Sequence, residues 1–482
     1  MSKRLTVLFI VSLVISVGEA ITFERSFGGS GADLGMSVRQ TPDGGYIVAG
    51  YSNSGLTSYD FCAVKTDAYG NSQWLKTYGG TELDAANCVE LASDGGYVMI
   101  GTTGSFGTGT PDFWIVKIDE QGNQSWDKPY GSTSHDEGYF IEKTFDGGYI
   151  ATGGYRSFDL CLFKLASNGD SSWLYRYGTT DLWEEGYCIR QTPDTGYVVC
   201  GYTSSEGAGL CDVWLIRANK YCDIMWRKIY GDTNNEEGKW VERTADGGYI
   251  ITGYTESFGA QGKDIWLLKT NADGDTEWTK RYGGSQNDEA YCVRPTPDGG
   301  YVIIGYTETQ GTAGASDVWL LKTNANGDTV WTKTYGSICG DVGYSVQVTT
   351  DSGYIICGQL GLNGVDIYLL KTDKNGYIGV EEKENPKSQI PNPKLEIIPS
   401  PAISKAIARI TADSPLKATL KLYDCAGREI STLFTGILHS RKDVTFSAPP
   451  GIYFVRLEEV QPQTERKSIS RLNLSRKIIF IQ

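Results

Sequence analysis

The stretch Thr296-Pro297-Asp298-Gly299-Gly300-Tyr301-Val302-Ile303-Ile304-Gly305 decides the fold, because its Asp-Gly-Gly-Tyr centre recurs along the chain. Pro, Asp and Gly favour a tight turn, and the β-branched run that follows them is typical of a strand. Recurrence at a period of about 50 residues indicates a repeat architecture, so seven copies predict seven similar units. The tyrosines of the copies, some with one substitution before the tyrosine, are Tyr46, Tyr97, Tyr149, Tyr197, Tyr249, Tyr301 and Tyr354.

One repeat contains four short strand patterns separated by turns. Tyr291–Arg294 and Tyr301–Gly305 flank the Asp-Gly-Gly turn, Asp317–Lys322 follows a polar loop, and Val330–Tyr335 completes the unit. Four strands in about 50 residues are typical of one β-propeller blade. We therefore predict an all-β protein whose residues 21–380 form a seven-bladed β-propeller.

The third and fourth strand patterns are joined by a turn that carries a tryptophan motif. The sequence Lys-Thr-Asp-x-x-Gly-x-x-x-Trp spans Lys65–Trp74 and recurs with substitutions at Lys117–Trp126, Lys269–Trp278 and Lys322–Trp331. This motif resembles the tryptophan-docking motif of quinoprotein-type propellers, and more broadly the repeats of secreted bacterial seven-bladed propellers. The resemblance implies that each tryptophan wedges between neighbouring blades, where a large ring buries about 150–250 Å².

The two ends of the repeat array complement each other. After the seventh third-strand pattern, Tyr377–Val380 lead into a charged segment without a Trp-x-Lys-x-Tyr strand. The missing strand lies at the start of the chain, where Phe23–Gly28 match Trp74–Gly79 position for position. We predict that this N-terminal strand completes the seventh blade and closes the ring, because closure removes exposed sheet edges.

Residues 1–20 have the pattern of a secretory signal peptide. Lys3 and Arg4 precede the apolar run Leu5–Val17, and Gly18-Glu19-Ala20 offers a small-residue cleavage site. The apolar run is shorter than the roughly 20 residues that a membrane-spanning helix needs. We therefore expect an exported protein with no transmembrane segment after signal removal.

The C-terminal part differs in composition from the repeats. Residues 381–393 are charged and then proline-rich, which predicts a stiff linker. In residues 394–482, Leu416–Tyr423 alternate apolar and polar side chains, and Ile452–Leu457 have the composition of a second strand. A segment of this length with such strands predicts a small antiparallel β-sandwich.

Several motifs of this tail resemble the C-terminal sorting domain (type A) of type IX secretion substrates. The resemblance implies that the type IX secretion machinery is a partner, that the tail is removed near the linker, and that the protein is secreted or held at the outer-membrane surface. The alternative is an ordinary accessory β-sandwich that binds or spaces, since a fold alone does not prove a function. The motifs are Leu422-Tyr423-Asp424, Gly427–Ile430, Gly451–Leu457 and Lys477–Ile481.

The charge of the chain narrows the classes of molecule that it can bind. The formal net charge is −14, and because residues 394–482 are net positive, the repeats are more acidic than the whole chain. An acidic body argues against nucleic acid or anionic lipid as a partner.

The 11 cysteines cannot all pair, and we expect most of them to be buried as small apolar side chains. Cys188 and Cys200, placed symmetrically about one turn, are the best disulfide candidates.

Each repeat carries one acid in the loop that enters its first strand, two residues before a Gly or Ala. Because the innermost strand follows directly, we expect these acids near one mouth of the central channel. One hypothesis is an acidic ring that binds a cation such as calcium or a hydroxyl-rich ligand. The other is that each carboxylate caps its own turn or pairs with a neighbouring base, which a feature present in every repeat favours. The acids are Asp33, Asp84, Asp136, Glu184, Glu236, Asp288 and Asp341.

Departures from the repeat mark where a specific site would lie. Trp183 precedes Glu184 and Glu185 in the fourth repeat, and His135 precedes Asp136 in the third. We expect these residues to be neighbours on the acidic face. Trp183 is positioned either to stack on a sugar ring or to fill a gap in the packing.

The remaining chemistry favours binding over catalysis. The chain has only two histidines, His135 and His439, which leaves almost no material for a Ser-His-Asp triad or a His-rich zinc site. We predict no cofactor and a monomeric, non-catalytic scaffold that displays loops for a glycan or protein at the cell surface. The alternative function is a carbohydrate-active hydrolase or lyase that uses two carboxylates of the acidic face.

Overall fold

The computed structural model describes two compact units of the chain, Met1–Glu381 and Glu382–Gln482. The expected signal peptide and linker lie outside the described residues. All regular structure in the described residues is β-strand. The described residues are 21–55, 58–108, 111–156, 159–178, 182–310, 315–337, 339–361 and 365–378, then 394–398, 406–411, 416–424, 429–438, 441–448, 451–459 and 473–480.

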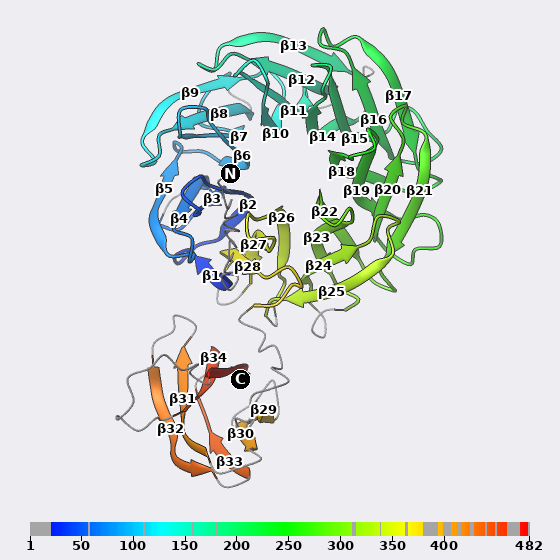
Figure 1. Ribbon diagram of the computed structural model, residues 1–482. Coiled ribbons are helices and arrows are strands. Elements are labelled where there is room, and N and C mark those ends of the chain that lie inside the picture. Colours follow the sequence, from blue (N-terminus) through cyan, green and yellow to red (C-terminus); the bar gives the residue numbers. More distant parts are fainter. Residues whose placement is uncertain are drawn as a thin grey trace, which may run out of the picture. The chain divides into compact units, whose positions relative to one another are not determined.

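Seven four-stranded antiparallel sheets form a ring, which confirms the seven-bladed β-propeller (Figure 1). The first strand of each repeat is innermost, and the chain then runs outward through the sheet. We call the end of the ring where the innermost strands begin the upper end, and the end where they finish the lower end. The innermost strands are β2 (Asp33–Gln40), β6 (Asp84–Leu91), β10 (Glu137–Lys143), β14 (Glu184–Gln191), β18 (Glu236–Arg243), β22 (Asp288–Pro295) and β26 (Val342–Val348).

Every innermost strand contains a β-bulge at the same place. In β14, for example, the pairing with the next strand shifts between Gly186 and Cys188, so that Tyr187 is the extra residue. A bulge leaves its residue unpaired and re-aims the side chain. The bulge residues are Met36, Asn87, Tyr139, Tyr187, Lys239, Tyr291 and Tyr344.

The second strands all begin at the tyrosine of the repeated motif. The Asp-Gly-Gly turn before each tyrosine needs a residue with positive φ, and Gly44 supplies it in the first blade with φ of 82°. The side chains that follow are buried between neighbouring sheets. The second strands are β3 (Tyr46–Ser52), β7 (Tyr97–Thr103), β11 (Tyr149–Tyr155), β15 (Tyr197–Thr203), β19 (Tyr249–Thr255), β23 (Tyr301–Thr307) and β27 (Tyr354–Leu360).

The third strands are the most deeply buried and hold a basic residue near their lower end. Lys65 of the first blade is buried, and its Nζ lies 2.8 Å from a carboxylate oxygen of Asp43 in the motif turn. The other oxygen of Asp43 accepts hydrogen bonds from Thr41 Oγ1 at 2.5 Å and from the Gly45 amide at 3.0 Å. The third strands are β4 (Asp60–Thr66), β8 (Asp112–Ile118), β12 (Asp159–Leu165), β16 (Asp212–Ala218), β20 (Asp264–Thr270), β24 (Asp317–Thr323) and β28 (Asp366–Thr372).

The same ion pair occurs in every blade, so the aspartate of the Asp-Gly-Gly-Tyr motif serves the scaffold. A buried charge that lost its partner would be strongly destabilising, which explains why both members recur. The pairs are Lys65–Asp43, Lys117–Asp94, Lys164–Asp146, Arg217–Asp194, Lys269–Asp246, Lys322–Asp298 and Lys371–Asp351.

The outer strands connect each blade to the next through a tryptophan. The ring of Trp74 lies against Gly122 and Tyr97 of the second blade, and the two ring centroids are 6.4 Å apart. Any Cβ on Gly122 would lie 3.1 Å from this ring, and its φ of 76° also favours glycine. The tryptophan therefore wedges between blades as expected. The outer strands are β5 (Ser72–Tyr78), β9 (Gln124–Tyr130), β13 (Ser171–Tyr177), β17 (Ile224–Tyr230), β21 (Thr276–Tyr282) and β25 (Thr329–Tyr335).

The N-terminal strand closes the ring, as predicted from the count of strands. β1 (Phe23–Phe27) pairs antiparallel with β28, with Phe23 opposite Lys371 and Phe27 opposite Ile367. Phe23 takes the place of the tryptophan, and its ring centroid lies 5.8 Å from that of Tyr46. The strand therefore joins the first and last blades by the same contact that joins the others.

The C-terminal unit consists of two antiparallel sheets, which fits the expected small β domain. Buried Ile410, Leu422 and Val455 belong to its core. One sheet has the strand order β29 (Lys394–Ile398), β30 (Ala406–Thr411) and β33 (Arg441–Phe446). The other has the order β32 (Glu429–Leu438), β31 (Leu416–Asp424), β34 (Gly451–Glu459) and β35 (Asn473–Phe480).

The described cysteines are free thiols, and most of them are buried. Cys188 and Cys200 face each other across β14 and β15, as their spacing predicted, but they do not form the disulfide for which they were candidates. Burial raises the pKa of the Cys188 thiol to about 12. These cysteines therefore act as small apolar side chains in the structure.

Candidate functional site

The seven acids of the entering loops are buried and make hydrogen bonds within their own blades. Asp84 accepts from the Gly80 amide at 2.9 Å and from Ser105 Oγ at 2.7 Å, and it also accepts from Thr103 Oγ1. Asp136 accepts from the amides of Ser132 and Arg156, both at 2.6 Å. Each carboxylate thus ties the entering loop to the end of the second strand.

The other five acids have the same surroundings. Asp33 and Asp288 bind the amide four residues earlier at 3.0 and 3.1 Å, and Glu236 binds the Asp232 amide at 2.9 Å. Asp341 accepts from the Gly361 amide at 2.7 Å, and Glu184 accepts from Thr203 Oγ1 at 3.3 Å. The geometry of all seven matches the hypothesis in which each acid caps its own turn.

The residue after each of these acids is partly exposed in most blades, and it breaks the seven-fold repeat. Blades three to six carry a glutamate there, whereas the other three blades carry a small or apolar residue. The glutamates are Glu137, Glu185, Glu237 and Glu289, and the other residues are Leu34, Ala85 and Val342. Of the four glutamates only Glu289 is fully buried.

The bulge residues add aromatic rings and one cation to the same four blades. Tyr139 Oη donates to Glu185 at 3.2 Å across the boundary between blades three and four, and it also donates to Glu137. The ring centroids of Tyr139 and Tyr187 are 5.0 Å apart. We call the set of Glu137, Tyr139, Glu185, Tyr187, Glu237, Lys239, Glu289 and Tyr291 the mouth cluster, because all eight lie near the upper start of the innermost strands.

Lys239 of blade five connects that blade to blade four. Its Nζ pairs with Glu237 and lies 3.9 Å from the ring centroid of Tyr187. On the far side, Tyr254 Oη donates to Glu237 at 2.6 Å, and Lys263 Nζ lies 3.3 Å from Glu289. Carboxylates and aromatic rings therefore alternate around more than half of the upper end.

Two carboxylates of the mouth cluster differ in acidity. Burial raises the pKa of Glu185, and the charge of Glu137 raises it further. Burial acts in the same direction on Glu237, but the Lys239 ammonium and hydrogen bonds from Lys239 and Tyr254 outweigh it and lower the pKa of Glu237. Neighbouring blades thus hold one carboxyl that retains its proton more readily and one that remains ionised.

His135 reaches Glu185 only through Glu137 and Tyr139, and the expected neighbourhood of His135, Glu185 and Trp183 on one face stays a prediction. His135 Nε2 lies 2.6 Å from Glu137, which shares Tyr139 with Glu185. Trp183 is 50 % exposed, and its amide donates to Ser204 Oγ at 2.8 Å. Its exposed ring is compatible with stacking and does not fill an internal gap.

Sequence reasoning missed Glu137, Glu237, Glu289 and the bulge residues. A signal for them was present, because each glutamate directly follows an acid that the repeat had already identified. Aligning the seven copies column by column shows that this position changes character between blades two and three and again between blades six and seven.

Clusters of metal ligands and helices able to span a membrane are both absent from the described residues. No group of three or more His, Cys, Asp or Glu side chains suited to a metal ion occurs among the described residues, and calcium binding remains a prediction. Across the described residues, no helix has the length and apolar character that crossing a membrane requires.

Comparisons with known proteins find similar folds. No protein-family model and no curated protein sequence matches the chain. One similar structure is PorZ, described as an essential surface component of the type IX secretion system of Porphyromonas gingivalis, at 12 % identity and a TM-score of 0.45. That match covers 94 % of this chain and 60 % of the PorZ chain, so this chain spans less than two thirds of the length of that chain.

Two further structures match the chain over a smaller part of its length. They are Sqt1 from Chaetomium thermophilum, with a TM-score of 0.43, and the BBS1N part of a complex with ARL6DN, with a TM-score of 0.44, each at 9 % identity. Each match covers 73 % of this chain, and the matches cover 99 % and 97 % of those two chains. At such identities the similarity concerns the fold alone.

Proposed function

We propose that this chain is an exported, non-catalytic β-propeller scaffold that binds a glycan or a protein at the cell surface through the mouth cluster. The observation that carries the proposal is the confinement to blades three to six of the glutamates that follow the buried acids, where they lie beside bulge residues that are tyrosines or Lys239. A binding site departs from the symmetry of its scaffold, because a ligand without that symmetry contacts only some of the repeats.

The chemistry of the mouth cluster favours a sugar as the ligand. Aromatic faces such as Tyr139 and Tyr187 offer flat apolar surface, and carboxylates accept hydrogen bonds from hydroxyl groups. Four glutamates against Lys239 and Lys263 leave this part of the surface acidic. We therefore expect neutral glycans or amino sugars to bind better than acidic polysaccharides.

The experiment is an array of neutral, amino-sugar and acidic glycans, with basic peptides beside them, probed with the full chain and two variants. Glu185→Gln removes one charged acceptor of the mouth cluster. Glu82→Gln removes the same charge from an exposed loop at the same end and is the matched control.

We expect Glu185→Gln to weaken binding about tenfold, because a hydrogen bond to a charged group contributes about 1.5–3 kcal/mol. Glu82→Gln should bind as the unchanged protein does. Binding of basic peptides alone would identify a protein ligand. The proposal fails if nothing on the array binds, or if the two variants lose the same affinity.

The difference in acidity between Glu185 and Glu237 favours a second candidate, a carbohydrate-active hydrolase. Glycosidases pair a protonated carboxylic acid with an ionised carboxylate, and environments that separate two pKa values produce such a pair. Release of reducing sugar from a bound glycan would support it, provided that Glu185→Gln and Glu237→Gln each abolish the release. Binding without release supports the scaffold.

The C-terminal unit is proposed to act as the address for type IX secretion. This proposal rests on the motifs of residues 394–482 and on the small β domain into which they fold. Expression of the full chain and of a variant that ends at residue 393, in a bacterium with a type IX system, would test it. We expect only the full chain to reach the medium or the cell surface, and equal export of both would contradict the proposal.

A further inference from the structure

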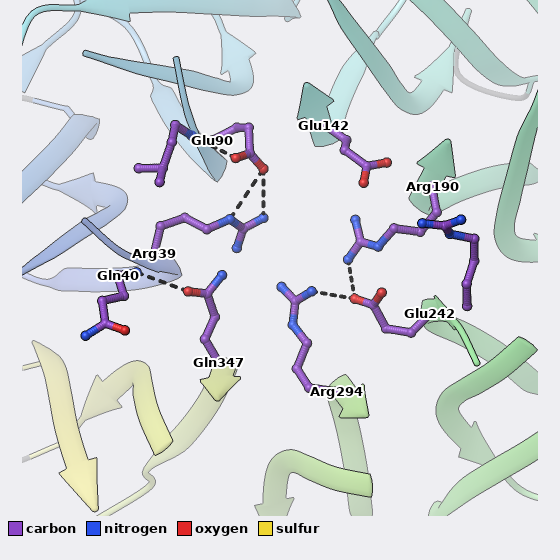
Figure 2. Close-up of a pocket in the computed structure, with 10 residues that line it drawn as sticks. Arg39, Gln40, Glu90, Glu142, Arg190, Glu242, Arg294 and Gln347 are labelled. Carbon is purple, nitrogen blue, oxygen red and sulfur yellow. Dashed lines mark hydrogen bonds and ion pairs between the residues drawn. The ribbon is translucent and has the colours of Figure 1, made fainter. Parts of the chain in front are cut away.

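A cavity of about 410 Å³ lies at the lower end of the innermost strands, away from the mouth cluster. Figure 2 shows its labelled side chains directed toward a common space. One position of the repeat, six residues after the buried acid of each blade, supplies most of the lining. From blade one to blade seven this position holds Arg39, Glu90, Glu142, Arg190, Glu242, Arg294 and Gln347.

These seven residues do not repeat, although the structure around them does. The strand, the bulge and the acid before them are the same in every blade, whereas their own charges alternate irregularly. The ion pairs of the turns, which serve the scaffold, keep a base and an aspartate at the same two positions in every blade, whereas these seven positions do not. The lower cavity therefore has the asymmetry expected of a binding site.

Two buried aromatic rings pack against arginines that line the cavity. Phe140 and Trp240, from blades three and five, meet edge to face with ring centroids 5.1 Å apart. Arg190 lies over both rings, at 4.5 Å from the centroid of Phe140 and 5.0 Å from that of Trp240. Arg294 lies 4.7 Å from the Trp240 centroid. The two guanidinium groups are thus held in place by packing before any ligand arrives.

The side chains that line the cavity carry an excess of positive charge, because the arginines outnumber the glutamates with which they pair. Glu242 is shared between Arg190, at 2.7 Å, and Arg294. Arg39 meets Glu90 only at 3.4 Å, which is longer than a good charge-assisted hydrogen bond. Exposed Arg243 adds a fourth guanidinium at the rim, so four arginines face three glutamates.

Glu142 contributes less negative charge than its position suggests. Burial raises the pKa of this carboxyl, and the nearby Glu242 and Glu90 act in the same direction against the opposing effect of Arg190. Its side chain accepts a hydrogen bond from the Gln191 amide at 2.8 Å. Because its pKa is raised, Glu142 takes up a proton more readily than an exposed glutamate does.

One donor at the centre of this excess has no acceptor. Arg294 Nε donates to the Val346 carbonyl at 3.2 Å and Nη1 donates to Glu242, but Nη2 is buried and finds no hydrogen-bond partner within the described part of the chain. A buried donor without an acceptor costs roughly 1–3 kcal/mol unless another molecule supplies one. This N–H is the strongest sign that the cavity accommodates an anionic group.

We propose that the lower cavity binds a small molecule through a carboxylate or phosphate group, which accepts hydrogen bonds from Arg294 and Arg39. The cavity volume is within the range of small-ligand sites. The site differs from the mouth cluster in place and in charge, so it does not depend on the function proposed above.

The experiment measures binding to the full chain by calorimetry at constant ionic strength, with glucuronate, succinate and inorganic phosphate as probes. Glucose is the neutral counterpart of glucuronate. Arg294→Gln removes the donor, and Lys143→Gln removes the same charge from an exposed residue next to Glu142. Saturation by glucuronate or succinate identifies a carboxylate site, and saturation by phosphate alone identifies a phosphate site.

We expect saturable binding of at least one anion and none of glucose. Arg294→Gln should weaken it about tenfold or more, and Lys143→Gln should leave it unchanged. Glu242→Gln removes the competing carboxylate and should strengthen anion binding, and the anion should then raise the melting temperature of this variant more than that of the unchanged protein.

The proposal is overturned if none of the three anions saturates the protein, or if the arginine and lysine variants weaken binding equally. It is also overturned if Glu242→Gln lowers both stability and anion affinity, because an ion-pair network that serves only the scaffold predicts that result. Glu185→Gln should not change anion binding, which keeps this test separate from that of the mouth cluster.

Discussion

Two consecutive residues at the upper end of each blade, the buried acid of the entering loop and the residue that follows it, differ in what they do. The first is an acid in all seven blades, is buried, and is bound by amides and hydroxyls of its own blade. The second is a glutamate in four consecutive blades and is small or apolar in the other three. Two adjacent positions of one blade thus follow opposite rules.

This contrast gives a criterion for telling residues that stabilise the blade from residues that bind a ligand in a repeat protein. A residue that solves a problem of the blade, such as satisfying the amides of a tight loop, must recur wherever the loop recurs. A residue that contacts an asymmetric ligand has no such reason to recur. By this criterion the mouth cluster and the lower cavity are two places where the propeller departs from its own repeat.

The largest expected effect appears when the two positions of one blade are each changed to alanine and the losses of stability are compared. Asp136→Ala removes the buried acceptor of the Ser132 and Arg156 amides, so we expect a loss of about 3 kcal/mol in the free energy of unfolding. Glu137→Ala, at the next residue, should cost less than about 1 kcal/mol, because its side chain is partly exposed. Urea unfolding of both variants measures the difference, and equal losses would remove the distinction between the two positions.

Low pH should reduce the stability that the carboxylates of the Asp-Gly-Gly turns, at the lower end of the ring, contribute to the fold. Burial alone would raise the pKa values of Asp43, Asp246 and Asp298, but hydrogen bonds from their lysine and threonine partners lower each of them to about 2. Because these values lie below the unfolded value of about 3.9, the stability they contribute is complete above about pH 4 and is lost as the pH falls toward 2.

The measurement is the melting temperature between pH 5 and pH 2, for the unchanged protein and for Lys322→Met. We expect a steep fall below pH 4 in the unchanged protein and a shallower fall in the variant, which lacks the partner of Asp298. Asp136 and Asp341, whose pKa values burial raises, act in the opposite sense as they take up protons. A melting temperature independent of pH below 4 would contradict the role given to the turn acids.

The smallest expected effect restores a missing contact at the ring closure. In the other blades the last tyrosine of the outer strand donates to a backbone carbonyl in the next blade, as Tyr78 does to Gly122 at 2.7 Å. The closing strand has Phe27 at this position. Phe27→Tyr should add a hydrogen bond to the Gly70 carbonyl and about 1 kcal/mol of stability. Chemical denaturation measures it, with Tyr78→Phe as the reciprocal loss, and a destabilised Phe27→Tyr would show that the closing blade packs differently.

Much of the fold could be predicted from sequence because the repeat supplies seven observations of each position. The strand count and the closure by the N-terminal strand followed from aligning copies, and the tryptophan wedge followed from the resemblance of its motif to that of quinoprotein-type propellers. The acids of the entering loops were placed in the right loops, but their burial was left open. A threonine at the end of several second strands, such as Thr103 and Thr255, indicates a buried partner for these acids.

The binding regions were harder to predict because they depend on distances across the ring. Phe140 and Trp240 lie in blades that are not adjacent, and nothing in either repeat indicates that their rings meet. The sharing of Glu242 by Arg190 and Arg294 likewise depends on how closely seven strands approach the axis. Irregularities in blades three and four were identified from sequence, and the column of glutamates that extends them to blades five and six was readable there but missed, whereas the contacts across the ring required the structure.

The central claim is that recognition resides in the second and bulge residues of blades three to six. The most direct test gives blade four the residues of blade two, as the variant Glu185→Ala with Tyr187→Asn, and measures its affinity for the best glycan of the array. The account predicts at least a tenfold loss of affinity with the melting temperature nearly unchanged, because both side chains are partly exposed. Unchanged affinity in a folded variant would contradict it.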